Sequence, residues 1–106
     1  MSNAFRRFEI LLPLRFNDGA VVPADLVGAT LVELEQRFGA VSSETQTIRG
    51  TWRHEGQSYR DDLMRVFVDA PDTAESLVFI RAFKETLKER FKQIDIWVTS
   101  YPVDVI

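Results

Sequence analysis

The stretch Thr47–Ala70, TIRGTWRHEGQSYRDDLMRVFVDA, decides the fold. Two runs rich in β-forming residues, Thr47–His54 and Gln57–Ala70, are separated only by Glu55-Gly56, a two-residue connection of the kind that closes a β-hairpin. A turn this short fixes the register of the two strands. The predicted cross-strand pairs are His54–Gln57, Trp52–Tyr59, Gly50–Asp61, Arg53–Ser58, Thr51–Arg60 and Arg49–Asp62.

One strand and one helix are predicted on each side of this hairpin. Apolar residues alternate in the two predicted strands and recur at helical spacing in the two predicted helices. The strands are Phe8–Arg15 and Ile94–Ile106, and the helices are Pro23–Phe38 and Asp72–Phe91. Gly39 follows the first helix as a C-terminal cap, and Asp72 has capping-box spacing to Glu75 at the start of the second. Met1–Arg7 is expected to be a loosely ordered lead-in.

The resulting order, β-α-β-β-α-β, is that of a ferredoxin-like α+β fold. We expect residues 1–106 to form a single domain, because a chain of this length holds one hydrophobic core. Right-handed crossovers would place both helices on one face of a four-stranded antiparallel sheet with strand order 4-1-3-2. The strands from Phe8–Arg15 and Gln57–Ala70 would then lie in the centre.

Composition excludes several classes of function. The chain has 13 basic and 16 acidic residues, no Cys and one His, and its pI is near 5.1. Without Cys there is no disulfide framework and no thiolate metal site, and we expect neither a metal nor a cofactor. The acidic pI makes nucleic acid an unlikely partner. The longest apolar runs are too short for a membrane span. Met1–Ala4 lacks the apolar region of a signal peptide, so we expect a cytoplasmic protein.

The sheet face without helices is expected to be apolar. If Phe8, Ile10 and Leu12 face the helices, Leu11 points the other way, and Trp97 joins it. One of the two apolar sets of Gln57–Ala70 must also point outward. Because large exposed apolar areas mark interfaces, we predict a homodimer or another homo-oligomer, and a protein partner is a further option.

The hairpin holds the residues that could carry chemistry. His54, Tyr59 and Asp61 could form an acid–base site, although a solvated surface histidine is the more ordinary interpretation of His54. Trp52 and Tyr59 could stack on a planar ligand or simply on each other. Trp52, Tyr59, Trp97 and Leu11 are therefore the candidate ligand or interface residues.

Arginine is concentrated in the same segment. The chain has ten Arg and three Lys, and four of the Arg lie between residues 49 and 65. They are Arg49, Arg53, Arg60 and Arg65. Because acidic residues are interleaved with them, we expect mutual ion pairs such as Arg49–Asp62 rather than an anion site. Binding of nucleic acid through this hairpin is a less favoured alternative.

Short motifs spread along the chain support a resemblance. They are Ile10-Leu11-Leu12-Pro13-Leu14, Asn17-Asp18-Gly19, Arg37-Phe38-Gly39, Gly50-Thr51-Trp52, Tyr59-Arg60-Asp61-Asp62 and Arg90-Phe91-Lys92-Gln93. Together they resemble an uncharacterised family of short bacterial hypothetical proteins with the pattern LPL…DxG…RFGG…GxW…RFxQ. The chain departs from it at Ala40, where the pattern has a second Gly. The resemblance implies a bacterial domain and brings no activity or site residues.

These observations leave three hypotheses about function. The first is a small self-associating domain that binds a protein partner or a small ligand. The second is a small cofactor-independent enzyme of the dimeric ferredoxin-like type that uses His54, Tyr59 and Asp61. The third, and least favoured, is a nucleic-acid-binding module.

Overall fold

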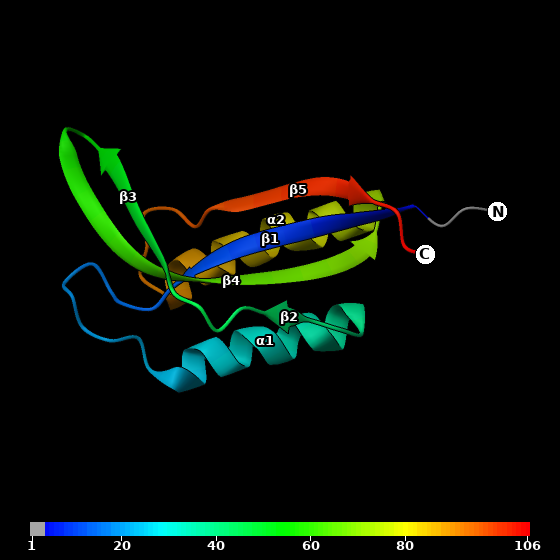
Figure 1. Ribbon diagram of the computed structural model, residues 1–106, viewed down its shortest axis with the longest axis horizontal. Helices are drawn as coiled ribbons and strands as arrows, with labels where there is room; N and C mark the ends of the chain where they lie inside the picture. The colour runs from blue at the N-terminus through cyan, green and yellow to red at the C-terminus, as the bar shows by residue number, and fades with distance from the viewer. Residues whose placement is uncertain (1–3) are drawn as a thin grey trace.

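The computed structural model describes residues 4–106 and contains one antiparallel sheet and two helices (Figure 1). The elements in chain order are β1 Phe5–Pro13, α1 Ala24–Phe38, β2 Ser42–Ser43, β3 Ile48–His54, β4 Gln57–Pro71, α2 Ala74–Arg90 and β5 Val98–Val103. The fold is α+β and ferredoxin-like. Among residues 4–106, no helix is long and apolar enough to cross a bilayer.

The sheet has five strands, so the prediction of four strands in the order 4-1-3-2 is wrong in its detail. Its path is β2-β4-β1-β5, and β3 also pairs with β4. Two separate strands, β2 and β3, therefore pair with the same edge of β4, and residues 45–47 connect them. β1 and β4 occupy the centre, as predicted.

The register of the hairpin is confirmed for all six predicted pairs, from Arg49↔Asp62 to His54↔Gln57 at the tip, and Ile48↔Leu63 adds a seventh pair at the base. Glu55 and Gly56 both have positive φ, 50° and 77°, which is the backbone that a tight two-residue hairpin turn requires. β4 pairs with β1 only from Leu63 onward. Residues 48–62 therefore form a two-stranded ribbon that projects beyond the sheet (Figure 1). We call it the hairpin arm.

The hydrophobic core lies between the sheet and the two helices. Alternate residues of the central strands face the helices and are buried, among them Ile10 and Leu12 of β1 and Val66 of β4. The helices contribute Leu34, Ile80, Phe83 and Leu87, and Phe91 follows α2. Leu77 of α2 has helical spacing to Ile80 but is 38% exposed.

Two element boundaries differ from prediction at the ends of the chain. β1 begins at Phe5, so residues 5–7 of the expected loose lead-in are in fact strand, and residues 1–3 lie outside the described residues. The last strand begins at Val98 instead of Ile94. Residues 94–97 form a connecting segment in which Ile96 is buried and Ile94 is 44% exposed.

The start of α2 also differs. Thr73, rather than Asp72, is the N-cap, and its hydroxyl accepts a hydrogen bond from the Ser76 N–H at 3.2 Å. Asp72 instead accepts from Arg6 at 3.1 Å. Both residue types cap helices well, so the sequence pattern alone does not separate the two positions. At the end of α1, Gly39 has φ 87° and confirms the predicted left-handed cap.

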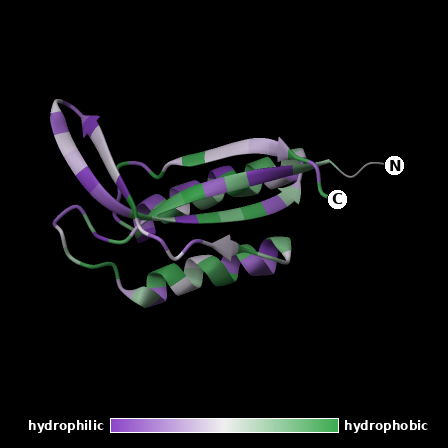
Figure 2. Cartoon of the chain, viewed as in Figure 1, coloured by the Kyte–Doolittle hydropathy of each residue, from purple (hydrophilic) through white to green (hydrophobic). Residues whose placement is uncertain are grey.

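The sheet face opposite the helices is mixed. As predicted, Leu11 and one apolar set of β4, Leu63 and Phe67, lie on it, but charged side chains lie among them. In Figure 2 hydrophilic and hydrophobic residues alternate along β1. Arg7 of β1 donates to both carboxylate oxygens of Asp69 on β4, at 2.8 and 2.9 Å. The guanidinium also lies over the Phe67 ring, 4.6 Å from its centroid. The hydrogen bonds from Arg7 lower the pKa of Asp69 below its ordinary value.

A second set of charges continues this face. Arg65 donates to Glu44 and lies 3.6 Å from a carboxylate oxygen of Glu9. Tyr101 donates its hydroxyl hydrogen to Glu9 at 3.2 Å. Long charged side chains in mutual pairs therefore cover part of the face, with Phe67 beneath Arg7. The other apolar residues of β1 and β4 on this face, Leu11, Pro13 and Leu63, lie at the end from which the hairpin arm projects.

Candidate functional site

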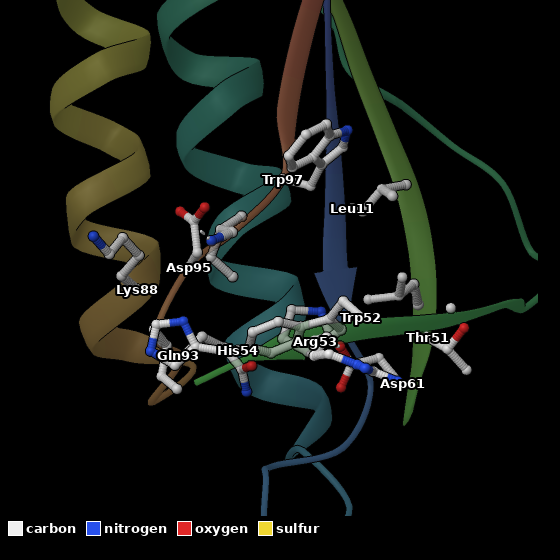
Figure 3. A pocket seen from close by; sticks show the side chains of 15 residues that line it. Leu11, Thr51, Trp52, Arg53, His54, Asp61, Lys88, Gln93, Asp95 and Trp97 are labelled. Atoms are coloured by element: carbon white, nitrogen blue, oxygen red, sulfur yellow. Dashed lines mark hydrogen bonds between the residues drawn. The ribbon is translucent and has the colours of Figure 1, made fainter. Parts of the chain in front are cut away.

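A cleft of about 730 Å³ opens between the hairpin arm and the segment 93–97 (Figure 3). Its apolar lining comes from β1, from the base of the arm and from the connecting segment. These residues are Leu11, Pro13, Leu63, Ile94 and Ile96. Clefts of this size, mostly apolar with a few polar groups, are typical of small-ligand sites.

Trp52 forms one wall of the cleft and is held from two sides. Its ring stacks on Tyr59, with centroids 4.5 Å apart and an interplanar angle of 18°. Its indole N–H donates to a carboxylate oxygen of Asp61. Both contacts follow from the hairpin register, because Tyr59 is the direct cross-strand partner of Trp52 and Asp61 is the diagonal one. The indole is therefore fixed in position before any ligand arrives.

Trp97 lies on the opposite side and is 65% exposed. Its backbone carbonyl accepts a hydrogen bond from the Leu11 N–H at 3.1 Å, which anchors the segment to β1. The two tryptophans of the chain thus both line the same cleft (Figure 3).

Asp95 and Lys88 contribute charge from the α2 side of the cleft. The Asp95 Oδ1 atom lies 3.1 Å from the Lys84 ammonium and accepts from the Ile96 N–H at 2.9 Å. Burial acts to raise the pKa of Asp95, but these two donors outweigh it and the pKa lies below its ordinary value. Asp95 is therefore a fixed negative charge at neutral pH.

Two carboxylate oxygens in the cleft still have acceptor capacity. The bonds to Asp61 and Asp95 each use one oxygen, Oδ2 and Oδ1 respectively. Within residues 4–106, neither Asp61 Oδ1 nor Asp95 Oδ2 takes part in a hydrogen bond. The cleft can therefore accept hydrogen bonds from amino or hydroxyl groups of a ligand.

His54, Tyr59 and Asp61 do not converge into an acid–base set. His54 lines the cleft, but its nearest carboxylate is that of Glu55, 3.8 Å away, and its side chain is 42% exposed. Tyr59 stacks behind Trp52 and is not among the lining residues. Asp61 is engaged by the indole. The arrangement is suited to binding more than to proton transfer, which needs groups within hydrogen-bond reach.

Three of the four predicted ligand or interface residues meet at the cleft: Leu11, Trp52 and Trp97. The fourth, Tyr59, supports Trp52. Lys88, Gln93 and Asp95 were missed, because they follow one another near the end of α2 and resemble ordinary surface residues in sequence. In the described part of the chain no group of three or more His, Asp or Glu side chains could hold a metal ion.

The chain is thus a ferredoxin-like α+β domain with an open cleft beside its hairpin arm. A phage SAM lyase in complex with S-methyl-5′-thioadenosine has a similar structure, with a TM-score of 0.68 and 17% sequence identity, over 99% of this chain and 92% of that one. CutA1 from Oryza sativa is similar with a TM-score of 0.61 and 14% identity, over 99% and 84%. At these identities the likeness shows the fold alone. No family model matches the chain, and no curated protein does.

Proposed function

We propose that this protein binds a purine nucleoside or a close relative of one in the cleft between the hairpin arm and the segment 93–97. The observation that carries the proposal is that two indoles and two carboxylates line the same cleft, and that each carboxylate keeps one oxygen free to accept a hydrogen bond. A flat aromatic base is attracted to exposed indole faces. Its amino group and the ribose hydroxyls are donors that match Asp61 and Asp95.

The likeness to the phage SAM lyase supports the choice of first probe. That protein is described in complex with S-methyl-5′-thioadenosine, which contains an adenine ring, a ribose and a thioether. Its ligand has the donors and the planar ring that the cleft is suited to hold. The comparison supplies a candidate ligand and no residue roles.

Intrinsic fluorescence tests this proposal directly, because Trp52 and Trp97 are the only tryptophans of the chain and both line the cleft. Titration with S-methyl-5′-thioadenosine should change the emission intensity in a saturable way. A non-aromatic disaccharide of similar size should not. An emission that stays unchanged up to millimolar nucleoside would overturn the proposal.

A matched pair of variants locates the site. Asp61→Asn keeps an acceptor for the Trp52 indole but removes the charge, and we expect it to weaken binding about tenfold, the loss of roughly one charged hydrogen bond. Asp62→Asn makes the same change one residue away, on the other face of β4, and should leave the affinity unchanged. Equal losses in both variants would contradict a site in the cleft.

The enzyme alternative can be tested in the same mixture. The enzyme hypothesis rests on the presence of His54 and Asp61 in the same cleft, although the two side chains are not hydrogen-bonded to each other in the described part of the chain. Consumption of the nucleoside that is lost in His54→Gln would favour it. Unchanged ligand after prolonged incubation with saturating protein would leave binding as the function.

We also propose that copies of this chain associate through the hairpin arm. Ion pairs between β1 and β4 cover part of the sheet face opposite the helices, which disfavours a dimer that packs sheet against sheet. The arm, however, is a two-stranded ribbon, and isolated ribbons of this kind are marginally stable in water. Light scattering at high micromolar concentration should reveal an oligomer, and a strict monomer would refute it. The cytoplasmic location stays a prediction, which cell fractionation tests.

A further inference from the structure

The hairpin arm separates charge between its two faces. Alternation along the strands places Trp52, His54 and Asp61 on one face. The other face carries Arg49, Thr51 and Arg53 from β3, and Ser58, Arg60 and Asp62 from β4. This second face, which we call the arginine face, has three Arg and one Asp in a chain whose formal net charge is −3.

Of the three arginines on this face, only Arg49 forms an ion pair of the kind predicted for the hairpin. Within residues 4–106, neither Arg53 nor Arg60 has a carboxylate oxygen within 4.0 Å. Arg49 lies 3.9 Å from Asp62, its side chain is 84% exposed, and Asp62 is shared with Arg15 at 3.5 Å. The prediction that these arginines are neutralised by neighbouring acids is therefore wrong for Arg53 and Arg60.

The three exposed arginines form a zigzag row along the two strands of the arm. Arg60 is level with Thr51 in the register, so Arg49, Arg60 and Arg53 follow one another in steps of two residues along the arm. Because Arg60 lies on β4 and the other two on β3, consecutive members are diagonal neighbours about 7–8 Å apart. Consecutive phosphates of a polynucleotide strand repeat at a similar distance, and guanidinium groups bind phosphate oxygens in a bidentate manner.

We propose that the arginine face binds the sugar–phosphate backbone of single-stranded nucleic acid, without reading its sequence. An extended single strand can follow this row of three cations along the arm. A strand of a duplex turns away by about a tenth of a helical turn per nucleotide, so fewer of its phosphates reach the row. An acidic peptide would need carboxylates at every second residue, whereas every nucleotide carries a phosphate. Thr51 and Ser58 add hydroxyl donors beside the row.

This site differs from the proposed nucleoside cleft, although Arg53 and Thr51 also border that cleft. Arg60 does not line it, and therefore serves as the test position. A failure of one proposal leaves the other standing, because the cleft is tested by tryptophan emission and the arginine face by binding of a labelled oligonucleotide.

The experiment is fluorescence anisotropy with a labelled oligothymidylate of about 20 nucleotides, long enough for one site. Three phosphate contacts predict a slope of about −2 in a plot of log affinity against log salt concentration, or a loss of about 15-fold between 50 and 200 mM salt. Arg60→Ala should bring the slope to about −1.4, and Arg60→Glu should weaken binding further.

Arg81 on α2 provides the matched control. It is exposed and, within residues 4–106, has no carboxylate within 4.0 Å, so Arg81→Ala and Arg81→Glu change net charge as the Arg60 variants do. They should bind like the unchanged protein. Absence of salt-dependent binding, an equal loss in the Arg81 variants, tighter binding to a duplex of the same length, or equal binding to an oligoglutamate would each overturn the proposal.

Discussion

Replacing Trp52 by Ala tests the reasoning about the hairpin arm most directly. The side chain is half-buried, stacks on Tyr59 and donates to Asp61. Truncation of a fully buried Trp costs about 3–5 kcal/mol, so a half-buried one should cost about 2 kcal/mol. Of this, about 0.5–1.5 kcal/mol belongs to the aromatic stack. We therefore expect the free energy of unfolding to fall by about 2 kcal/mol.

The assay is urea unfolding followed by far-ultraviolet circular dichroism, which does not depend on the tryptophan removed. Trp97→Ala is the control, since Trp97 borders the same cleft but is 65% exposed and should lose about 0.5 kcal/mol or less. A double-mutant cycle with Tyr59→Ala isolates the stack, and its coupling energy should be about 1 kcal/mol.

Two results would refute this reasoning. One is a stability of Trp52→Ala within about 0.5 kcal/mol of the unchanged protein, and the other is an equal loss in Trp97→Ala. Amide hydrogen exchange of Ile48–His54 gives an independent check, because the arm should exchange faster once the stack is gone. Fast exchange of these amides in the unchanged protein would show that the stack does not order the arm.

Three further predictions concern stability. Gly28→Ala should raise the free energy of unfolding by about 1 kcal/mol in urea titration, because a Cβ at this interior position of α1 meets nothing within 4 Å. Gly56→Ala should lower it by about 1 kcal/mol in the same assay, since φ is +77° at that turn. The ion pair with Arg7 lowers the pKa of Asp69 below its ordinary value of 3.8. The stabilisation that the ionised Asp69 gives the folded protein is therefore complete well above pH 4, and it is lost as the pH falls towards the pKa of Asp69 in the folded state. Asp69→Asn should therefore be less stable than the unchanged protein at pH 7, with a gap that narrows at pH 3; a constant gap would contradict the assignment.

The local parts of this fold are predictable from the sequence. The two-residue turn fixes the hairpin, and the Trp52–Tyr59 pair follows from counting outward from it. Gly39 marks the end of α1 for a similarly local reason, because the residue there adopts positive φ. Such features depend on a few neighbouring residues, and few competing arrangements satisfy them.

Other parts depend on contacts between distant segments. Ser42–Ser43 has no apolar alternation, and β2 exists only because β4 offers it backbone partners. The cleft is formed by the hairpin arm meeting residues 93–97, and the sequence does not indicate which face of the arm this segment approaches. The Trp52–Asp61 hydrogen bond could have been anticipated, since the diagonal neighbours of a known register lie within reach of a long side chain.

The pairing of β1 has a consequence for the folding kinetics. Phe5 is the partner of Pro71 on one side and of Val103 on the other. During synthesis β1 can therefore gain its first partner only once β4 has been made, about 50 residues later, and its second only once β5 emerges from the ribosome. Non-local pairing of this kind slows folding, whereas the hairpin arm can form alone within microseconds. Until β5 arrives, one edge of a central strand is unpaired and open to pairing with other chains.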